Sequence, residues 1–230
     1  HTLMAQDTGW PEVKTEAKPG SRWWWMGSAV DKENLTYNLE EYAKAGIVAM
    51  EITPIYGVQG YDEKEIKYLS PQWMDMLKHT ENEAARLGMQ IDMSNGTGWP
   101  FGGPEVSIED AASKLIISEY RLTGGKKQTI AITVEDEKQK PYAKLNRLMA
   151  FSEKGQCLDL TAMVANGSLT WKAPKGEWRL LAAFCGKTFQ QVKRAAPGGE
   201  GFVMNHLAAT AVENYLGKFE KAFSLSNTSY

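Results

Sequence analysis

The chain lacks the marks of several common protein classes. Its 230 residues include only two cysteines and three histidines, and lysine plus arginine (26) nearly balances aspartate plus glutamate (28). Two cysteines are too few for a disulfide scaffold, and a balanced charge lacks the basic surface that drives nucleic-acid binding. No apolar run approaches the roughly 20 residues that a membrane-spanning helix needs. We therefore expect no nucleic-acid partner and no membrane span.

Several catalytic motifs are also missing. No G-x-G-x-x-G or P-loop follows a predicted strand, and no G-x-S-x-G marks a hydrolase nucleophile. The histidines do not have the spacing of a zinc site. Residues 1–20 show neither the basic segment nor the apolar core of an intact signal peptide, so we interpret them as an N-terminal extension. The sequence does not decide whether Cys157 and Cys185 form a bridge.

Residues 21–112 alternate strand and helix signals. Asp31 and Ser70 are typical N-cap residues and precede two amphipathic stretches. Three apolar runs predict strands, at residues 22–26, 47–53 and 89–93. Strands and helices in this alternation, with short connections, predict right-handed parallel βαβ units. The continuous apolar run of the second strand is typical of a parallel strand covered on both faces.

Residues 113–196 change character. Short alternating runs separated by turn residues predict strands of an antiparallel sandwich or small barrel. Trp171 and Trp178 flank the turn APKGE. We interpret this segment as a hairpin with two core tryptophans, because large aromatic residues are mostly packing residues. The alternative is an exposed aromatic platform for a sugar.

Residues 197–230 return to the first pattern. A brief apolar run, FVMN, predicts a strand, and the next stretch predicts an amphipathic helix with a buried stripe of Val212, Tyr215, Leu216, Phe219 and Phe223. A (β/α)8 barrel takes about 250 residues without insertions. Three βα units and one later helix cannot close one. Either the fold is a smaller open sheet, or this chain is the N-terminal portion of a larger protein.

The carboxyl ends of parallel strands are where α/β proteins place functional groups. That rule selects residues at and after the three strand ends, namely Trp25, Met26, Gly27, Ser28, Glu51, Thr53, Tyr56, Asp92, Asn95, Thr97 and Trp99. Five of them, Trp25, Glu51, Asp92, Asn95 and Trp99, are the candidate site residues. Glu51 and Asp92 are single carboxylates within apolar strands. Because burying an unpaired carboxylate is costly, each needs an ion-pair partner or an open cleft.

The loop SNGTGWPFGGP at residues 94–104 is the most specific local feature. Its glycines let backbone N–H groups approach a ligand closely, and Trp99 either stacks on the apolar face of a sugar or plugs the fold. His206 follows the FVMN run, at the position of a strand-end residue, and is a sixth candidate for substrate binding.

An ordered set of segments resembles a known family. The segments are RWWWMGSAV, KAGIVAMEI, LSPQWMDMLKHTENEAARLGMQIDMSNGTGWPFGG, LTWKAPKGEWRLLAAF, VKRAAPGGEGFVMNHL and AVENYL. Together they resemble the N-terminal barrel region of glycoside hydrolase family 106, whose characterised members are α-L-rhamnosidases of polysaccharide-degrading bacteria. The resemblance covers about residues 20 to 223.

The resemblance implies an α/β fold, a partial (β/α)8 TIM barrel with an antiparallel β-rich insertion at 113–196. It implies calcium-assisted, inverting hydrolysis of an oligosaccharide or polysaccharide by an exported enzyme, periplasmic or extracellular. The family's catalytic glutamates lie downstream of the matched region, so no catalytic residue is transferred, and the strand-end candidates are expected only to line the sugar pocket. Asn205 stands where an acid is expected, and an amide cannot act as a base.

Two classes of function therefore remain open. The first is a fragment of a rhamnosidase-like glycoside hydrolase, inactive by itself because the catalytic acids lie elsewhere. The second is a non-catalytic carbohydrate-binding or structural β domain, using Trp171 and Trp178, attached to a βα segment.

Overall fold

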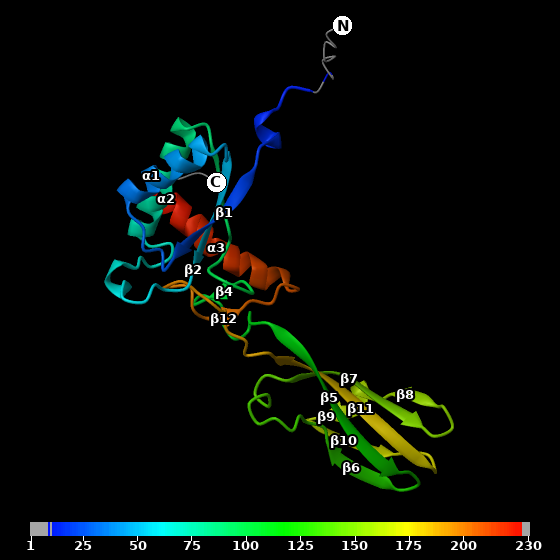
Figure 1. Cartoon of the computed structure of the whole chain (residues 1–230). Helices are drawn as coiled ribbons and strands as arrows, with labels where there is room; N and C mark the ends of the chain where they lie inside the picture. Colours follow the sequence, from blue (N-terminus) through cyan, green and yellow to red (C-terminus); the bar gives the residue numbers. More distant parts are fainter. Residues whose placement is uncertain (1–8, 10, 227–230) are drawn as a thin grey trace. The chain divides into compact units, whose positions relative to one another are not determined.

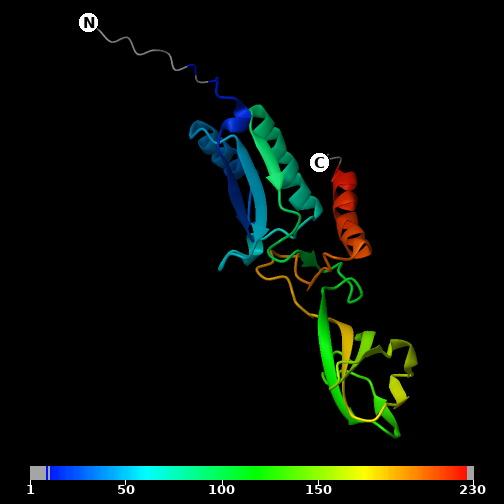
Figure 2. The ribbon, with the colours of Figure 1, turned by 90° about the vertical axis from the view of Figure 1, so that its right-hand side faces the viewer.

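The chain folds into two compact units in the computed structural model, which describes residue 9 and residues 11–226. The α/β unit contains the chain up to Ser107, residues 191–204 and the part from Ala209 onward, and the β unit contains residues 108–190 and 205–208. The predicted extension, residues 1–20, lies partly outside the described residues. Figures 1 and 2 show the helices and parallel strands of the first unit and the antiparallel strands of the second.

The α/β unit is built on a three-stranded parallel sheet in the order β1-β2-β3. Its elements in chain order are η1 (Thr15–Ala17), β1 (Gly20–Met26), α1 (Lys32–Lys44), β2 (Ala49–Ile55), η2 (Asp62–Lys64), α2 (Pro71–Arg86) and β3 (Gln90–Met93). The predicted parallel βαβ arrangement is confirmed for these strands. The helix starts are confirmed as well: Asp31 accepts a hydrogen bond from the Asn34 amide at 2.9 Å, and the Ser70 hydroxyl accepts one from the Trp73 amide at 3.3 Å.

A continuous run of aromatic rings forms the core between the sheet and the helices. Neighbouring ring centroids lie 5.0 to 6.4 Å apart, mostly edge to face, which is the favoured geometry for such pairs. The rings in order are Tyr42, Trp23, Trp25, Trp73, Tyr68, Phe219 and Tyr215. The run joins α1, β1, α2 and the last helix into one packed body.

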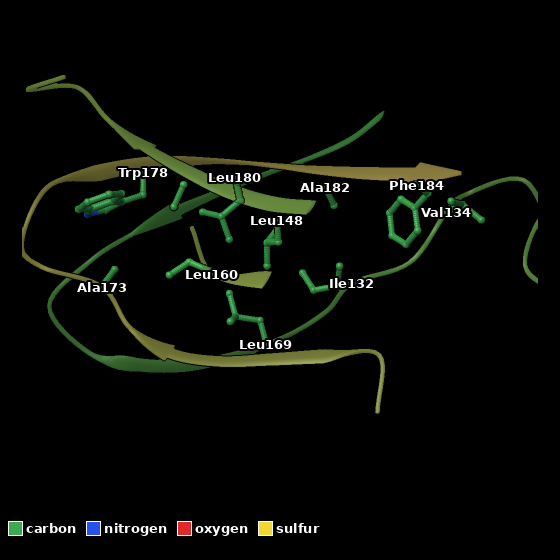
Figure 3. Packing of buried hydrophobic residues seen from close by; sticks show 11 residues of the cluster. Ile132, Val134, Leu148, Leu160, Leu169, Ala173, Trp178, Leu180, Ala182 and Phe184 are labelled. Carbon is green, nitrogen blue, oxygen red and sulfur yellow. The ribbon is translucent and has the colours of Figure 1, made fainter. Parts of the chain in front are cut away.

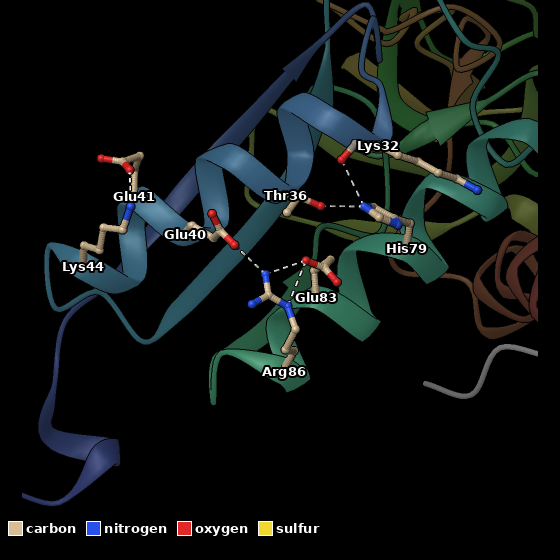
Figure 4. Close-up of polar contacts among 8 residues, drawn as sticks. All are labelled: Lys32, Thr36, Glu40, Glu41, Lys44, His79, Glu83 and Arg86. Atoms are coloured by element: carbon tan, nitrogen blue, oxygen red, sulfur yellow. Dashed lines mark hydrogen bonds and ion pairs between the residues drawn. The ribbon is translucent and has the colours of Figure 1, made fainter.

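Polar contacts hold α1 against α2 on the solvent side of this core (Figure 4). The Arg86 guanidinium contacts the carboxylates of Glu83 at 2.7 Å and Glu40 at 2.8 Å. The His79 Nε2 lies 2.9 Å from the Thr36 hydroxyl and 3.0 Å from a backbone carbonyl of α1. His79 therefore serves the packing of the two helices.

The FVMN run does not join the parallel sheet. Within it, β12 (Phe202–Val203) pairs antiparallel with β4 (Gly102–Gly103) in a separate two-stranded ladder. A Cβ atom on Gly102 would lie 2.1 Å from the Phe202 carbonyl oxygen, so the close approach of the two backbones requires glycine there. We expected the FVMN strand to continue the parallel β/α pattern. It pairs with β4 instead, so that expectation was wrong.

The last helix, α3 (Ala209–Ser226), buries Ala211, Tyr215, Phe219 and Phe223. Leu216, expected on the buried stripe, is 41% exposed. Within the described residues, no helix is long and apolar enough to cross a membrane.

The β unit consists of two antiparallel sheets, in the orders β5-β11-β7-β8 and β6-β10-β9. Its elements are β5 (Ser113–Thr123), β6 (Lys127–Ala131), β7 (Lys144–Ser152), β8 (Cys157–Asp159), η3 (Thr161–Met163), β9 (Val164–Ala165), β10 (Ser168–Lys172) and β11 (Glu177–Lys187). Apolar side chains of both sheets, including Leu148, Leu169 and Leu180, form the core (Figure 3). An antiparallel sandwich is therefore confirmed.

The predicted hairpin around the APKGE turn is wrong. Trp171 lies on β10 and Trp178 on β11, and these strands belong to different sheets. The two rings meet edge to face with centroids 5.1 Å apart; Trp178 is a buried core residue, as expected, and Trp171 is partly buried and packs against that core. The turn thus carries the chain from one sheet to the other. Cys157 and Cys185 are both exposed free thiols, so they form no bridge.

Candidate functional site

One face of the parallel sheet, opposite the face that packs on rings of α1 and α2, carries mixed polar and aromatic side chains. We call it the open face and define it by Arg22, Trp24, Met26, Glu51 and Asp92. The register places Arg22 beside Glu51 and Glu51 beside Asp92. Because side chains alternate along a strand, Trp23 and Trp25 point to the opposite side, where they contact rings of the two helices. Trp24 and Met26 are 45% and 41% exposed.

Only the carboxyl-terminal part of β2 is covered on both faces of the sheet. Thr53 and Ile55, nearer its carboxyl end, are fully buried, whereas Glu51 keeps about a third of its side chain exposed. We expected both faces of this strand to be buried along its whole length; the partly exposed Glu51 side chain shows that this expectation was wrong at that position.

Glu51 has the partner that its position in an apolar strand requires. The Arg22 guanidinium donates two hydrogen bonds to Glu51 Oε2, from Nε at 3.1 Å and from Nη2 at 3.0 Å. Charge-assisted contacts of this kind are shorter and stronger than hydrogen bonds between neutral groups. Glu51 is thus suited to accept hydrogen bonds from hydroxyl groups.

Asp92 extends the polar surface to the next strand. Its side chain is exposed, and in the described part of the chain it makes no hydrogen bond or ion pair. A groove of about 300 Å³ is lined by Gly20, Ser21, Arg22, Ala49, Glu51 and Asp92. Two carboxylates and one guanidinium therefore line the same concave surface, which suits a ligand rich in hydroxyl groups.

Trp99 lies against this surface. Its ring centroid is 6.1 Å from that of Trp24, at an interplanar angle of 70°, and the Arg22 Cζ lies 5.8 Å from the Trp99 centroid. The Trp99 backbone exchanges two hydrogen bonds with Lys193, at 3.1 and 3.0 Å. The loop after β3 thus places its tryptophan beside the open face.

The glycines of that loop serve the chain itself. Gly98 has a φ of +101°, and a Cβ atom there would lie 2.2 Å from the Lys193 carbonyl oxygen. The close backbone approach that we expected for a ligand is made here by residues 191–204.

Trp25 and Asn95 lie apart from the cluster of Trp24, Trp99, Arg22 and Glu51. Trp25 is fully buried on the helix side, with its ring centroid 5.5 Å from that of Trp73. Asn95 is exposed, and with Asp92 it lines a separate groove of about 550 Å³ along the β3 edge. The structure therefore brings together Glu51, Asp92 and Trp99, but not Trp25.

His206 belongs to the β unit, where it is exposed. Its neighbour Asn205 has a local role, since its amide donates to the Ser113 hydroxyl at 3.3 Å and its side-chain oxygen accepts from the Leu207 amide at 3.1 Å. The reason for choosing His206, a strand end in the parallel sheet, no longer holds, because the preceding strand pairs elsewhere.

Arg22 and Trp24 were not among the site residues predicted from the sequence. Strand alternation within RWWWM separates the middle tryptophan from its two neighbours, so the pattern could have identified both. Tyr56 was among the residues selected after the second strand, whereas Arg194, which it meets at the end of β2, was not predicted. Tyr56 donates its amide to the Arg194 carbonyl at 2.8 Å, and the Arg194 Cζ lies 5.7 Å from the Tyr56 centroid. Both have positive φ, a conformation that clusters at functional sites.

Calcium is the metal that the family resemblance implies. Calcium takes six to eight oxygen ligands. Within residue 9 and residues 11–226, no three side chains among His, Cys, Asp and Glu gather so that they could hold a metal ion. The residues described do not by themselves fit calcium, and no step is derived through it.

Comparisons with known proteins give a matching family, a curated relative and a solved structure of similar fold. A family model of glycoside hydrolase family 106, described as alpha-L-rhamnosidase, matches residues 12–146, more than half of the chain. A protein of Formosa agariphila named "Putative beta-glucuronidase" is 27% identical over 248 residues, which cover 91% of this chain. The structure of a rhamnosidase from Novosphingobium sp. PP1Y is similar in fold, with a TM-score of 0.65 at 15% identity over 94% of this chain.

Both relatives are much longer than the chain. The chain spans 21% of the Formosa protein and 37% of the Novosphingobium chain.

Proposed function

Because the chain belongs to glycoside hydrolase family 106, we propose that it is part of an enzyme that removes terminal α-L-rhamnose from an oligosaccharide or plant polysaccharide. The observation that carries this proposal is the open face, where the exposed Trp24 and the partly buried Trp99 adjoin an ion pair and a free carboxylate. The apolar C–H face of a sugar stacks on an aromatic ring, and its hydroxyl groups donate to carboxylates. The arrangement supplies both kinds of contact on one surface.

In this proposal the chain forms the first part of a (β/α)8 barrel, and the open face is turned to the barrel interior. The β3 strand is at the edge of its sheet, with no neighbour on its outer side among the described residues. Beside that edge runs the groove of about 550 Å³, which includes the apolar side chains of Leu216, Phe219 and Phe223. An apolar groove next to a free parallel strand supports the docking of a further strand.

The sugar contacts are assigned to Trp24 and Trp99 for stacking and to Glu51 and Asp92 for hydrogen bonds. Glu51 is held by Arg22 and serves binding; the two carboxyl groups that inversion requires, roughly 6.5–9.5 Å apart, are assigned to parts of the protein beyond this chain. Calcium remains a proposal for the whole protein, as does export to the periplasm or the medium.

The experiment compares the whole protein with residues 1–230 on aryl α-L-rhamnoside and aryl β-glucuronide. We expect the whole protein to cleave the rhamnoside, with inverted anomeric configuration seen by NMR at early times, and the short chain to show no turnover. Turnover by the short chain would overturn the placement of the catalytic acids. Cleavage of the glucuronide alone would overturn the substrate class.

The alternative, a carbohydrate-binding β domain that uses Trp171 and Trp178, gains no support. Trp178 is 3% exposed, and Trp171 packs against the same core. Both rings therefore serve the packing of the β unit.

A further inference from the structure

Lys218 of α3 is enclosed to a degree that is rare for lysine. Its side chain is 8% exposed, although lysine is almost never buried without a partner. The ammonium nitrogen lies 4.0 Å from the ring centroid of Tyr215, 5.2 Å from that of Phe219 and 5.8 Å from that of Tyr68. Three aromatic faces thus surround one cation, an arrangement in which cation–π attraction is strengthened by the loss of water.

The same ammonium group meets the end of the glycine-rich loop. Lys218 Nζ lies 3.4 Å from Glu105 Oε2. A Cβ atom on Gly103 would lie 3.2 Å from Lys218 Nζ and 2.9 Å from the Glu105 carboxylate, so the loop backbone passes directly over the cation. Burial lowers the pKa of Lys218, and the nearby Glu105 carboxylate opposes that shift.

One turn earlier, α3 holds the beginning of the same loop. The Tyr215 hydroxyl donates a hydrogen bond to the Asn95 carbonyl oxygen at 2.6 Å. The loop is therefore attached to α3 at Asn95 and at Glu105. Trp99, which reaches the open face, lies between these two attachments in the chain.

We propose that Lys218 is a positioning residue that fastens the loop of residues 94–106 to α3 and thereby holds Trp99 beside the open face. The consequence for substrate binding rests on the proposed function, in which Trp99 stacks on the sugar. Packing alone does not call for a charge here, because Phe219 and Phe223 already bury the helix and an apolar side chain would avoid the desolvation of an ammonium group. What the ammonium group adds is a directional contact with both the rings and Glu105.

The test replaces Lys218 by methionine, which keeps the length of the side chain and removes its charge. Lys221→Met is the matched control, because Lys221 is exposed on the same helix. In residues 1–230, amide hydrogen exchange of residues 94–106 is expected to be about 10-fold faster in Lys218→Met than in the control. Exchange in the β strands of the other unit should be unchanged in both variants.

Two further variants separate a positioning role from a merely structural one. Lys218→Arg keeps a cation that stacks on rings, and we expect it to restore much of the slow exchange. Tyr215→Phe removes only the hydroxyl bond to Asn95, so it should speed exchange near residue 95 even if Lys218→Met does not fold. Equal loop exchange in Lys218→Met and Lys221→Met, or unchanged exchange in Tyr215→Phe, would overturn the proposal.

Kinetics of the whole enzyme connect this loop to substrate. We expect Lys218→Met to raise KM about 10-fold with kcat within about 2-fold, because a displaced Trp99 weakens binding more than chemistry. Faster loop exchange with unchanged KM would support the fastening role of Lys218 and count against the sugar-binding role of Trp99.

Discussion

A buried hydrogen bond between Trp73 and Ser28 anchors the carboxyl end of β1, and its removal should be costly. The Trp73 Nε1 donates to the Ser28 hydroxyl at 3.0 Å, and both residues are fully buried. Ser28 follows the strand in a left-handed conformation, with a φ of +49°. The bond thus ties the turn after β1 to the first turn of α2.

The expected cost of Trp73→Phe has two parts. Phenylalanine has one ring where tryptophan has two fused rings, so the substitution removes about three buried atoms. At about 0.8 kcal/mol for each buried group of methylene size, this loss of packing costs roughly 2–3 kcal/mol. The Ser28 hydroxyl then stays buried without a partner, which costs about 1–3 kcal/mol. The total of about 3–6 kcal/mol is a large part of the roughly 5–15 kcal/mol by which domains are stable.

A double-mutant cycle isolates the hydrogen bond from the packing. Ser28→Ala alone orphans the indole N–H, whereas the double variant leaves neither partner unpaired, so its loss should fall short of the sum by about 1–2 kcal/mol. Any backbone strain caused by alanine at residue 28 is present in both the single and the double variant, so it cancels in the interaction free energy. Urea unfolding, with the transition of each unit followed separately, measures these free energies.

The control pairs Ser28→Ala with Trp178→Phe, because Trp178 lies in the other unit and donates to the Pro174 carbonyl. That pair should be additive. If the Trp73 and Ser28 substitutions were also additive within about 0.3 kcal/mol, the anchoring role of their hydrogen bond would be refuted.

Three smaller predictions concern single side chains. Thr97→Val should raise the free energy of unfolding by about 1 kcal/mol, because the Thr97 hydroxyl is buried with no hydrogen-bond partner in the described residues; a loss of stability in thermal melts would show that the hydroxyl is bonded. Asp31→Ala should cost about 1 kcal/mol at neutral pH through loss of the N-cap. The Asn34 amide lowers the pKa of Asp31 below its usual 3.8, so this contribution is present above that pH and is lost as the pH falls through the lowered pKa. The free energies of unfolding of the two proteins should therefore converge as the solution is acidified below that pKa, and a constant gap would contradict the assignment. Trp24→Ala should weaken rhamnoside binding to the whole enzyme about 5- to 10-fold, since burying the exposed 45% of a side chain of roughly 150–250 Å² is worth at most about 3 kcal/mol, and stacking on a sugar covers only part of that area. Tyr37→Ala, which removes an aromatic ring that is 60% exposed on α1, is its control, and equal affinities by calorimetry would exclude Trp24 from the site.

Much of the local structure was predictable because its causes are local. Asp31 and Ser70 cap the helices that follow them, and the apolar runs became parallel strands. A capping bond spans three residues, and apolar periodicity acts within a few turns, so both are visible in a short window of sequence. The Glu51 carboxylate also required a partner or a cleft, and Arg22 supplies the partner.

The site was harder to predict than the strands that support it. Strand ends selected Trp25 because it closes the apolar run, but side-chain alternation turns it into the helix-side core and leaves Trp24 on the open face. His206 was chosen from its distance to an expected strand of the parallel sheet. That strand pairs with Gly102 and Gly103 instead, about a hundred residues away, and nothing local records the pairing.

By itself, the sequence determined the strands of the parallel sheet, the starts of two helices, the β-rich character of residues 113–196 and the resemblance to a glycosidase family. Tertiary structure alone decided which tryptophan meets Arg22, which sheet receives β10 or β11, and where the Lys218 ammonium lies. The physical reason is distance along the chain. Caps and periodicity depend on neighbours, whereas strand pairing, ring contacts and the enclosure of a charge depend on residues that only folding brings together.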